Sequence, residues 1–245
     1  MQNQAITDSF NDPMGAAITD FHRTGKADKL RVFSSMFEED EIPVEVLFRQ
    51  YDEMPELEQT ALQLAKGRIL DVGAGAGCHS LALQDMQKDV TAIDISPLSV
   101  SVMKERGVKN AQLQDFFEDG YSEKFDTIIM LMNGTGIVGK LKNIGAFFDK
   151  AKQLLSSDGQ VLIDSTDLAY IFEDEDGFFD ATEFENYYGE VDFQMQYKNI
   201  KGEPFDWLYL DLETLSQAAE AHGFQAELLK EGENDDYLAR LTVKQ

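Results

Sequence analysis

The chain has 245 residues, of which 43% are hydrophobic and 11% aromatic, and its formal net charge is −25. This length and composition predict one packed domain with a small addition and exclude a disordered chain. The 46 acidic residues outnumber the 21 basic ones, so the surface would repel DNA and RNA phosphates, and we expect no nucleic-acid partner.

Membrane and secretion signals are not expected. No apolar run approaches the roughly 20 residues that cross a bilayer, and the first residues lack the basic and apolar regions of a signal peptide. The single cysteine, Cys78, excludes an internal disulfide framework. These features predict a cytoplasmic protein with no membrane partner, and they are compatible with a monomer or an oligomer.

Residues 1–66 are the first of four expected regions and read as a helical segment. Apolar residues recur at helical spacing in 45–51 and 55–66. The stretch 9–24 contains Asn, Asp, Pro and Gly, which predicts a loosely ordered lead-in.

A regular alternation of strands and helices is expected over 67–164. This rhythm is typical of an α/β fold with a parallel, doubly wound sheet and helices on both faces. Ser96 and Pro97 are suited to begin a helix, and Gly107 to end it. The expected strands are 68–72, 90–94, 111–114, 125–132 and 160–164, and the expected helices are 77–87, 96–107 and 141–155.

Residues 165–206 are expected to form an insertion with a β-hairpin. Apolar and polar residues alternate over 191–197 and 205–209, on either side of a turn at Lys201 and Gly202. The aromatic side chains of this part could line an acceptor site or pack the hairpin; they are Tyr187, Tyr188, Tyr197 and Trp207.

The last region, 207–245, is expected to complete the core sheet. A helix over 212–222 is predicted by an Asp at its start and a Gly just after its end. Two closing strands are expected over 224–229 and 237–243.

A glycine-rich loop, 71–77, follows the first core strand. In open α/β sheets, ligands bind beyond the carboxyl ends of the strands. Gly73, Gly75 and Gly77 let the backbone turn tightly and approach a ligand without an intervening Cβ. Packing alone can also explain such a turn, so a ligand site at this loop has to be indicated by residues at other positions as well.

Two acidic residues at the ends of the next strands provide that support. Asp94 lies about 20 residues after the glycine loop, where a carboxylate can accept both hydroxyls of a ribose. Asp115 ends the third strand and can accept an adenine amino group, while the adjacent Phe116 can cover the ring.

With these motifs, residues 67–164 resemble the class I S-adenosylmethionine-dependent methyltransferases. The resemblance implies a Rossmann-like sheet of seven strands, the last antiparallel, and an N-terminal segment that covers the site as a lid. It also implies S-adenosyl-L-methionine as cofactor and S-adenosyl-L-homocysteine as product. The implied cofactor contacts are Asp71, Gly73, Ala74, Gly75, Gly77, Asp94, Ile95, Asp115, Phe116, Met132 and Asn133.

Two other functions are compatible with parts of this pattern. A nicotinamide-dependent oxidoreductase would place its third glycine at position 78, which is Cys; the glycine falls at Gly77 instead. That offset and Asp115 favour S-adenosylmethionine. The other alternative is a regulatory protein that binds the cofactor without turnover.

The sequence indicates less about the methyl acceptor than about the cofactor. Methyl transfer needs an aligned nucleophile, and it needs a general base only where the acceptor must lose a proton. The loop 132–136 lacks the Asn/Asp-Pro-Pro-aromatic element of methyltransferases that act on amino groups of DNA and proteins. We therefore expect a small-molecule acceptor or an exposed protein side chain.

Candidate catalytic groups are His22, His79 and Asn133. His22 belongs to the lid segment, and His79 could either face the cofactor or pack in the core. No metal site is expected: the run of carboxylates at 173–176 is a solvated loop in this interpretation, since consecutive acidic residues rarely converge on one ion.

Overall fold

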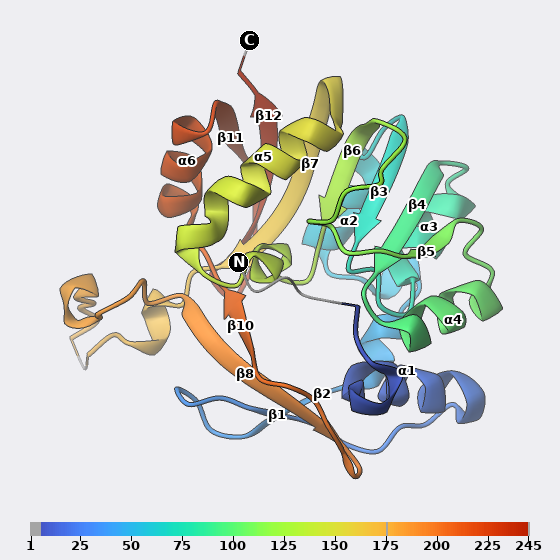
Figure 1. The fold of residues 1–245 in the computed structure, drawn as a ribbon. Coiled ribbons are helices and arrows are strands. Elements are labelled where there is room, and N and C mark those ends of the chain that lie inside the picture. Colours follow the sequence, from blue (N-terminus) through green and yellow to red (C-terminus); the bar gives the residue numbers. More distant parts are fainter. Residues whose placement is uncertain (1–5, 175, 245) are drawn as a thin grey trace.

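The larger of two sheets in the computed structural model has seven strands, in the order β11-β12-β7-β6-β3-β4-β5 (Figure 1). The structure describes residues 6–174 and 176–244, without the side chain of Glu183. The strands are β3 (Arg68–Val72), β4 (Asp89–Asp94), β5 (Ala111–Leu113), β6 (Phe125–Met130), β7 (Leu155–Thr166), β11 (Phe224–Glu231) and β12 (Asp236–Val243). All neighbours are parallel except β12, which is antiparallel to both β7 and β11. The expected Rossmann-like sheet with an antiparallel last strand is confirmed.

Both faces of this sheet are covered. Leu70 and Ile128 belong to a cluster with the aromatic residues of α5, whereas their neighbours Ile69 and Ile129 belong to a cluster on the other face. Successive side chains of a strand point to opposite faces, so continuous apolar runs supply both clusters. The helices are α1 (Pro13–Thr24), α2 (Glu56–Leu64), α3 (Cys78–Asp85), α4 (Pro97–Arg106), α5 (Ile144–Leu154) and α6 (Leu212–Ala221).

The predicted ends of α4 are confirmed. The Ser96 side chain accepts a hydrogen bond from the backbone N–H of Ser99, and Pro97 is the first helical residue. Gly107 ends the helix in the left-handed region, at φ +99°.

A second sheet lies across the carboxyl-end edge of the first (Figure 1). Its order is β10-β8-β1-β2, and the short β9 pairs with β8. The expected hairpin is present, with Phe205 opposite Phe193. The sheet contains β1 (Leu30–Phe33), β2 (Asp40–Ile42), β8 (Glu190–Tyr197), β9 (Ile200–Lys201) and β10 (Phe205–Leu208).

The strands β1 and β2 were not expected within the N-terminal segment. They are four and three residues long, too short for an alternating pattern to be recognised. Their pairing with β8 comes from tertiary structure, since Leu30 lies opposite Tyr197, far along the chain.

The expectation of a loosely ordered lead-in over 9–24 is wrong. A 3-10 turn, Ser9–Asn11, is followed by α1, whose N-cap Asp12 accepts the Gly15 backbone N–H and whose first residue is Pro13. An Asp-Pro pair is a helix-start signal, and it outweighs the turn-forming residues nearby. The helix expected over 45–51 is instead two 3-10 turns, Val44–Phe48 and Tyr51–Glu53.

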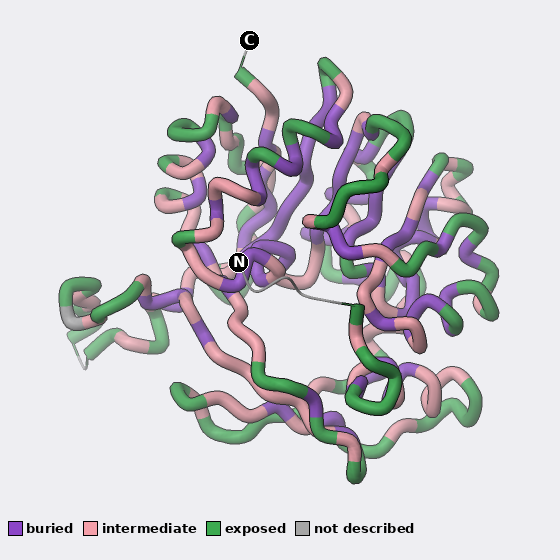
Figure 2. Tube along the Cα trace, in the orientation of Figure 1, coloured by how far each residue is buried: buried purple, intermediate pink, exposed green. Residues whose placement is uncertain are grey.

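The two sheets differ in burial (Figure 2). Strands of the larger sheet are largely buried, whereas the second sheet is a mixture of buried, half-buried and exposed residues. In the described part of the chain, no helix combines the length and apolar character required to cross a bilayer.

Candidate active site

The glycine loop turns from β3 into α3. Gly73 and Gly75 have φ of +70° and +56°, and a Cβ added to either would meet no described atom within 4 Å. Gly77 has φ +83°, but a Cβ there would lie 2.9 Å from Val108 Cγ2. The first two glycines therefore leave room for a ligand, and the third permits close packing beside α4.

Asp94, at the end of β4, is joined to this loop. Its Oδ2 accepts the Gly75 backbone N–H at 2.8 Å, and its Oδ1 accepts that of Ser96 at 2.8 Å. Burial raises the pKa of Asp94 to about 6. Each carboxylate oxygen can accept further hydrogen bonds, so Asp94 retains acceptor capacity for a ligand.

Hydrogen bonds at Asp71 and Ala74 hold the glycine loop in place, and Ile95 joins the neighbouring strand end to the N-terminal segment. The buried Asp71 accepts a hydrogen bond from Ser80 Oγ at 2.6 Å, which fixes the start of α3, and burial raises the pKa of this carboxyl. The Ala74 N–H donates to the Ile93 carbonyl at 3.0 Å. The Ile95 carbonyl accepts from the Thr7 N–H at 2.9 Å, so the N-terminal segment passes directly beside Asp94.

Asp115 and Phe116 follow β5. Oδ1 of Asp115 accepts the Phe117 N–H at 2.8 Å, and burial raises the pKa of Asp115. The Phe116 ring is only 3% exposed and packs against Phe117 and Phe147, with ring centroids 5.2 and 6.1 Å away. Phe116 therefore contributes to the core, and contact of its ring with adenine stays a prediction.

The loop after β6 is held by a residue that the sequence did not single out. Met132 and Asn133 adopt left-handed φ of +66° and +60°. Asp164, at the end of the strand next to β6, accepts the backbone N–H groups of Met132 at 2.9 Å and Gly134 at 3.0 Å. Burial raises the pKa of Asp164 to about 6. Asp164 lies near the end of a strand, as Asp94 does, and this position was the signal that could have identified it from the sequence.

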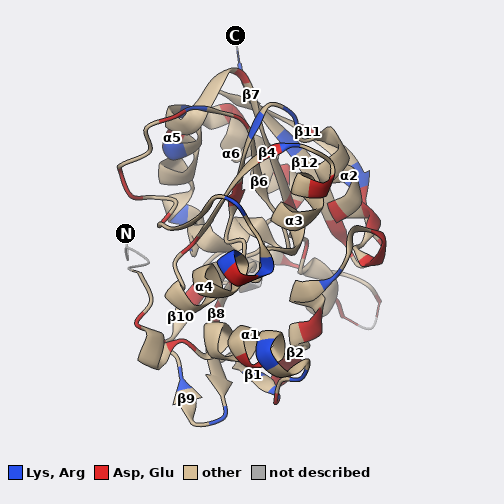
Figure 3. Cartoon of the chain, turned by 90° about the vertical axis from the view of Figure 1, so that its right-hand side faces the viewer, with Lys and Arg blue, Asp and Glu red and all other residues tan. Residues whose placement is uncertain are grey.

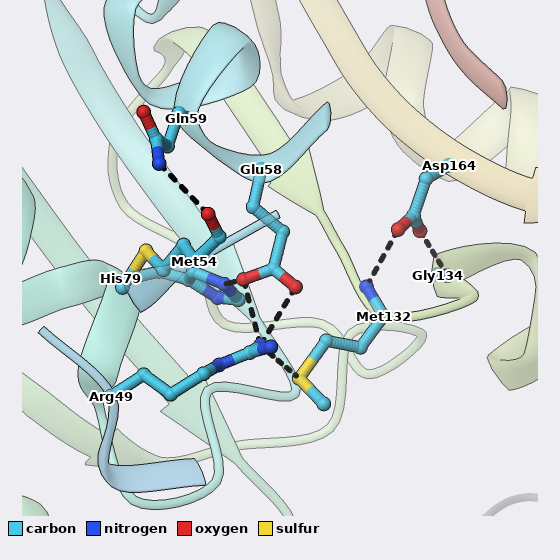
Figure 4. A network of polar contacts seen from close by, with 8 residues as sticks. All are labelled: Arg49, Met54, Glu58, Gln59, His79, Met132, Gly134 and Asp164. Atoms are coloured by element: carbon cyan, nitrogen blue, oxygen red, sulfur yellow. Dashed lines mark hydrogen bonds and ion pairs between the residues drawn. The ribbon is translucent and has the colours of Figure 1, made fainter. Parts of the chain in front are cut away.

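A buried ionic network connects this loop with α3 (Figure 4). Glu58 of α2 accepts from Arg49 Nη2 at 2.7 and 2.9 Å and lies 2.7 Å from His79 Nε2. Arg49 Nη2 also lies 3.9 Å from Met132 Sδ. Neither Arg49 nor Glu58 was expected, because their segment shows only apolar helical spacing in the sequence.

This network favours the protonated form of His79. Burial opposes its protonation, but the Glu58 hydrogen bond and the nearby carboxylates of Asp71 and Asp164 outweigh that cost and raise its pKa. Burial also opposes ionisation of Glu58, yet His79 and Arg49 hold the pKa of Glu58 below its usual value. A protonated imidazole cannot accept a proton, so a base role for His79 stays a prediction that this geometry does not support.

His22 lies in the last turn of α1, at the opposite end of this helix from Asp12. Its Nε2 is 3.2 Å from a Glu105 carboxylate oxygen, near the C-terminus of α4 and roughly 14 Å along that helix from Ser96. The N-terminus of α1, by contrast, is fastened beside the site, since the buried Asp12 accepts a hydrogen bond from Ser96 Oγ. After Asp164, Arg49 and Glu58, Asp12 is thus a fourth residue that was not expected from the sequence.

Of the four aromatic residues singled out in the insertion, two pack against other parts of the protein and two line a cavity. Tyr197 is buried and donates to Asp20, and a Cβ on Gly136 would overlap the Trp207 ring. Tyr187 and Tyr188 line a cavity of about 430 Å³ together with Asp167 and Asp211. This cavity lies beside α6, on the opposite side of the molecule from α3 and α4 (Figure 1).

In the described part of the chain, neither the distribution of charged side chains nor that of potential metal ligands marks a further binding group at this site. Lys and Arg are scattered among several elements in the view of Figure 3, with Asp and Glu between them. Within residues 6–174 and 176–244, no group of three His, Cys, Asp or Glu side chains is arranged to hold a metal ion. Of the acidic run at 173–176, Glu175 lies outside the described residues. The Cys78 thiol is buried, which raises its pKa to about 12.

Comparison with known proteins places this site in a family. Residues 46–229 match the family described as "Methyltransferase domain". A SAM-dependent methyltransferase from Bacteroides fragilis, solved in complex with S-adenosyl-L-homocysteine, is 60% identical; the match covers 100% of both chains with a TM-score of 0.94.

More distant matches agree with this. An uncharacterized methyltransferase from Staphylococcus carnosus is 36% identical over 84 residues, which span 34% of this chain and 39% of that protein. The CcbJ methyltransferase from Streptomyces caelestis shares the fold, with 13% identity, a TM-score of 0.59 and coverage of 80% and 95% of the two chains. The chain belongs to the SAM-dependent methyltransferase family.

Proposed function

We propose that this chain transfers the methyl group of S-adenosyl-L-methionine to a small-molecule acceptor and releases S-adenosyl-L-homocysteine. The observation that carries this proposal is the hydrogen bond between Gly75 and Asp94, which joins an open glycine loop to the carboxylate that would bind the ribose, at one edge of the sheet. The Bacteroides fragilis relative, solved with S-adenosyl-L-homocysteine, supports the choice of cofactor.

The residues present fit this cofactor. Asp94 would accept the ribose hydroxyls, Asp115 the adenine amino group, and the loop from Gly73 to Gly77 would enclose the methionine part. The loop at Met132 and Asn133 would border the reactive end. When bound, the cofactor supplies a methyl group activated by a sulfonium, so the protein's task is to align the acceptor and exclude water.

The second sheet and α1 would provide the acceptor-side cover. The sequence assigned a lid to residues 1–66 and a cap to 165–206; we propose that both contribute, since β1 and β2 pair with β8 in one sheet. The cover is joined to the core by Asp12 with Ser96 at one end and by Thr135 with the Leu208 carbonyl at the other.

Asn133 is the group that we assign to the acceptor. Its Oδ1 accepts from Thr166 Oγ1 at 2.9 Å, which orients the amide and directs its two N–H donors away from Thr166. His79, whose pKa the network raises, and the distant His22 favour an acceptor that needs no protein base. The acidic surface favours a neutral or cationic metabolite over nucleic acid, and the cytoplasm remains the expected location.

Calorimetric titration with S-adenosyl-L-homocysteine tests the cofactor assignment. Asp94→Ala should weaken binding by about tenfold or more, because ribose hydrogen bonds to a charged group are lost. Asp149→Ala, an exposed change on α5, is the matched control and should bind like the wild type. Absence of binding by the wild type would refute the proposal.

Turnover is tested separately. The protein is incubated with S-adenosyl-L-methionine and a panel of amines, phenols and carboxylic acids, and S-adenosyl-L-homocysteine release is measured. DNA, tRNA and a protein mixture form parallel arms. Binding without turnover in every arm would favour the regulatory alternative, and turnover confined to a macromolecule would overturn the small-molecule assignment.

A further inference from the structure

The cavity beside α6 is separate from the candidate active site. Its volume of about 430 Å³ is within the range of small-molecule sites. Its described lining comes from the segment between β7 and β8 and from the start of α6. That segment projects from the body of the molecule on the side away from α4 (Figure 1). None of the proposed cofactor contacts is among the described lining residues, so the cavity needs an explanation of its own.

Aromatic side chains form part of the cavity wall. They are Phe179, Tyr187 and Tyr188. The ring centroid of Tyr188 lies 4.6 Å from that of Tyr187 and 4.7 Å from that of Phe179, so the three rings support one another. The faces of such rings carry negative charge density and attract cations.

Carboxyl groups line the same cavity. They belong to Asp167, Asp211 and Glu213. Burial opposes ionisation of Asp211, but hydrogen bonds from Thr214 and Tyr187 outweigh this cost and hold the pKa of Asp211 below its usual value. The described lining contains no Lys, Arg or His, and none of the three carboxylates belongs to an ion pair of the described residues. The cavity therefore carries negative charge that no described basic side chain neutralises.

The tyrosine hydroxyls hold two of these carboxylates in place. Tyr187 donates to Asp211 Oδ2 at 2.6 Å and accepts the Asp211 backbone N–H at 2.9 Å. Tyr188 donates to Asp167 Oδ1 at 2.7 Å. The hydrogen bonds that the described residues give to Asp167 both end on Oδ1, which leaves Oδ2 as an acceptor for a ligand.

The start of α6 opposes a cation only weakly. A helix N-terminus carries about half a positive charge. Asp211 is the N-cap of α6 and accepts the Thr214 N–H at 2.7 Å, which offsets this partial charge and leaves Asp167 and Glu213 in excess. A metal ion is a poor match, because no three described His, Cys, Asp or Glu side chains are arranged to hold one. The carboxylates and aromatic faces together favour an organic cation.

We propose that this cavity binds a small organic ammonium ion, with its nitrogen beside the Asp167 carboxylate and its apolar part against the three aromatic rings. The carboxylate would accept a charge-assisted hydrogen bond, and the rings would add cation–π attraction. The inference goes beyond the proposed function, because ammonium binding here requires neither the cofactor nor methyl transfer.

Two matched pairs of probes test the role of charge. Benzylamine and choline are cations at neutral pH, whereas benzyl alcohol and dimethylbutanol have nearly the same shapes without the charge. Titration calorimetry with saturating S-adenosyl-L-homocysteine should show at least one cation binding about tenfold or more tightly than its neutral partner. Equal affinities within both pairs, or no binding of either cation up to about 10 mM, would overturn the proposal.

A variant of the cavity locates the bound cation. Gln217 is an exposed lining residue whose side-chain amide donates to Glu213 Oε1 at 3.0 Å. In Gln217→Lys the new ammonium pairs with Glu213 one helical turn earlier, which supports α6 while adding positive charge to the cavity. This variant should bind the cations about tenfold or more weakly and keep its affinity for S-adenosyl-L-homocysteine within about twofold.

Gln225→Lys is the matched control, because it makes the same change at an exposed position of β11 that is not among the lining residues. It should keep cation affinity within about twofold of the wild type. Unchanged binding in Gln217→Lys would place the cation elsewhere, and equal losses in both variants would reflect net charge alone; either result would overturn the proposal. Normal binding of S-adenosyl-L-homocysteine without cation binding would refute this inference and leave the proposed function intact.

Discussion

The seven-stranded sheet and the second sheet are stabilised in different ways. The larger sheet is enclosed by two apolar clusters, one on each face, with α5 on one side and α2 and α3 on the other. The second sheet has mostly half-buried strands and a smaller apolar cluster, in which Leu30 and Tyr197 pack with Val102 of α4. Polar contacts, such as Thr135 with the Leu208 carbonyl, add to its attachment. Apolar burial tolerates little displacement, whereas a few hydrogen bonds can be exchanged.

This difference matches the two halves of the proposed reaction. The proposed cofactor residues lie at strand ends of the enclosed sheet, where neighbouring strands pair in parallel. In the proposal, the acceptor side is bordered by the second sheet, whose smaller apolar cluster would permit small adjustments. Three measurements test whether the two regions differ in this way.

The largest effect is expected in the core cluster. Phe148 is fully buried, with its ring centroid 5.0 Å from Phe147 and 5.1 Å from Phe224. Phe148→Ala leaves a cavity and should lower the free energy of unfolding by about 3–5 kcal/mol in urea denaturation. Phe178→Ala, whose ring is 64% exposed, is the control and should change it by less than about 0.5 kcal/mol. Similar losses in both would contradict this account of the core.

An intermediate effect is expected at the junction. Thr135 Oγ1 lies 2.7 Å from Ser165 Oγ and donates to the Leu208 carbonyl at 2.8 Å. Thr135→Val removes both hydrogen bonds, although Ser165 Oγ keeps the one from the Leu210 N–H, and should lower the free energy of unfolding by about 1–3 kcal/mol. Thr24→Val, at the exposed end of α1, is the control.

The same variant separates the two halves of the reaction. Because most of the proposed cofactor contacts, in the glycine loop and at Asp94 and Asp115, follow other strands than β6, Thr135→Val should leave S-adenosyl-L-homocysteine affinity within about twofold of the wild type. Turnover should fall more than cofactor binding. A loss of cofactor affinity as large as the loss of turnover would show that the two regions act as one.

The smallest effect is a pH dependence that differs between the regions. Burial raises the pKa of Asp94 and Asp164 from 3.8 to about 6, so the folded state holds protons that the unfolded chain has released. Their contribution to stability is complete below about pH 3.8 and is lost as the pH rises through about 6. In the second region, Lys198 lowers the pKa of Asp20, whose contribution is present above pH 3.8 and is lost below it.

Thermal unfolding therefore should occur at a higher temperature at pH 5.5 than at pH 8, by about 3 °C or more. Repetition in 0.5 M NaCl separates this effect from repulsion among surface carboxylates, which salt screens while buried groups are screened much less. A melting temperature that rises toward pH 8, or a difference that disappears in salt, would contradict the role of the buried carboxyl groups.

Local patterns were sufficient for much of the larger sheet. The helix starting at Pro97 and ending at Gly107 was expected from capping residues that act within a few positions, and the antiparallel β12 was implied by the resemblance to the methyltransferases. The cap of α1 by Asp12 carried the same kind of signal but was obscured by turn-forming neighbours. The cofactor contacts of the glycine loop, Asp94 and Asp115 were also proposed from local motifs and stay predictions.

The contacts that surround the site depended on distant segments. Arg49, Glu58 and His79 are brought together from three different elements, and no spacing in the sequence marks them as a set. Phe116 could be placed next to Asp115 from the sequence, but whether its ring faced a ligand or the core depended on Phe147.

The sequence by itself determined the order of elements in the core, the tight glycine turn and the family, because these follow from residue chemistry over short spans of chain. Only the tertiary structure decided that β1 and β2 join β8 in a second sheet and that Arg49, Glu58 and His79 meet in one buried network. Those features arise from packing between residues far apart in the chain, which local periodicity does not encode.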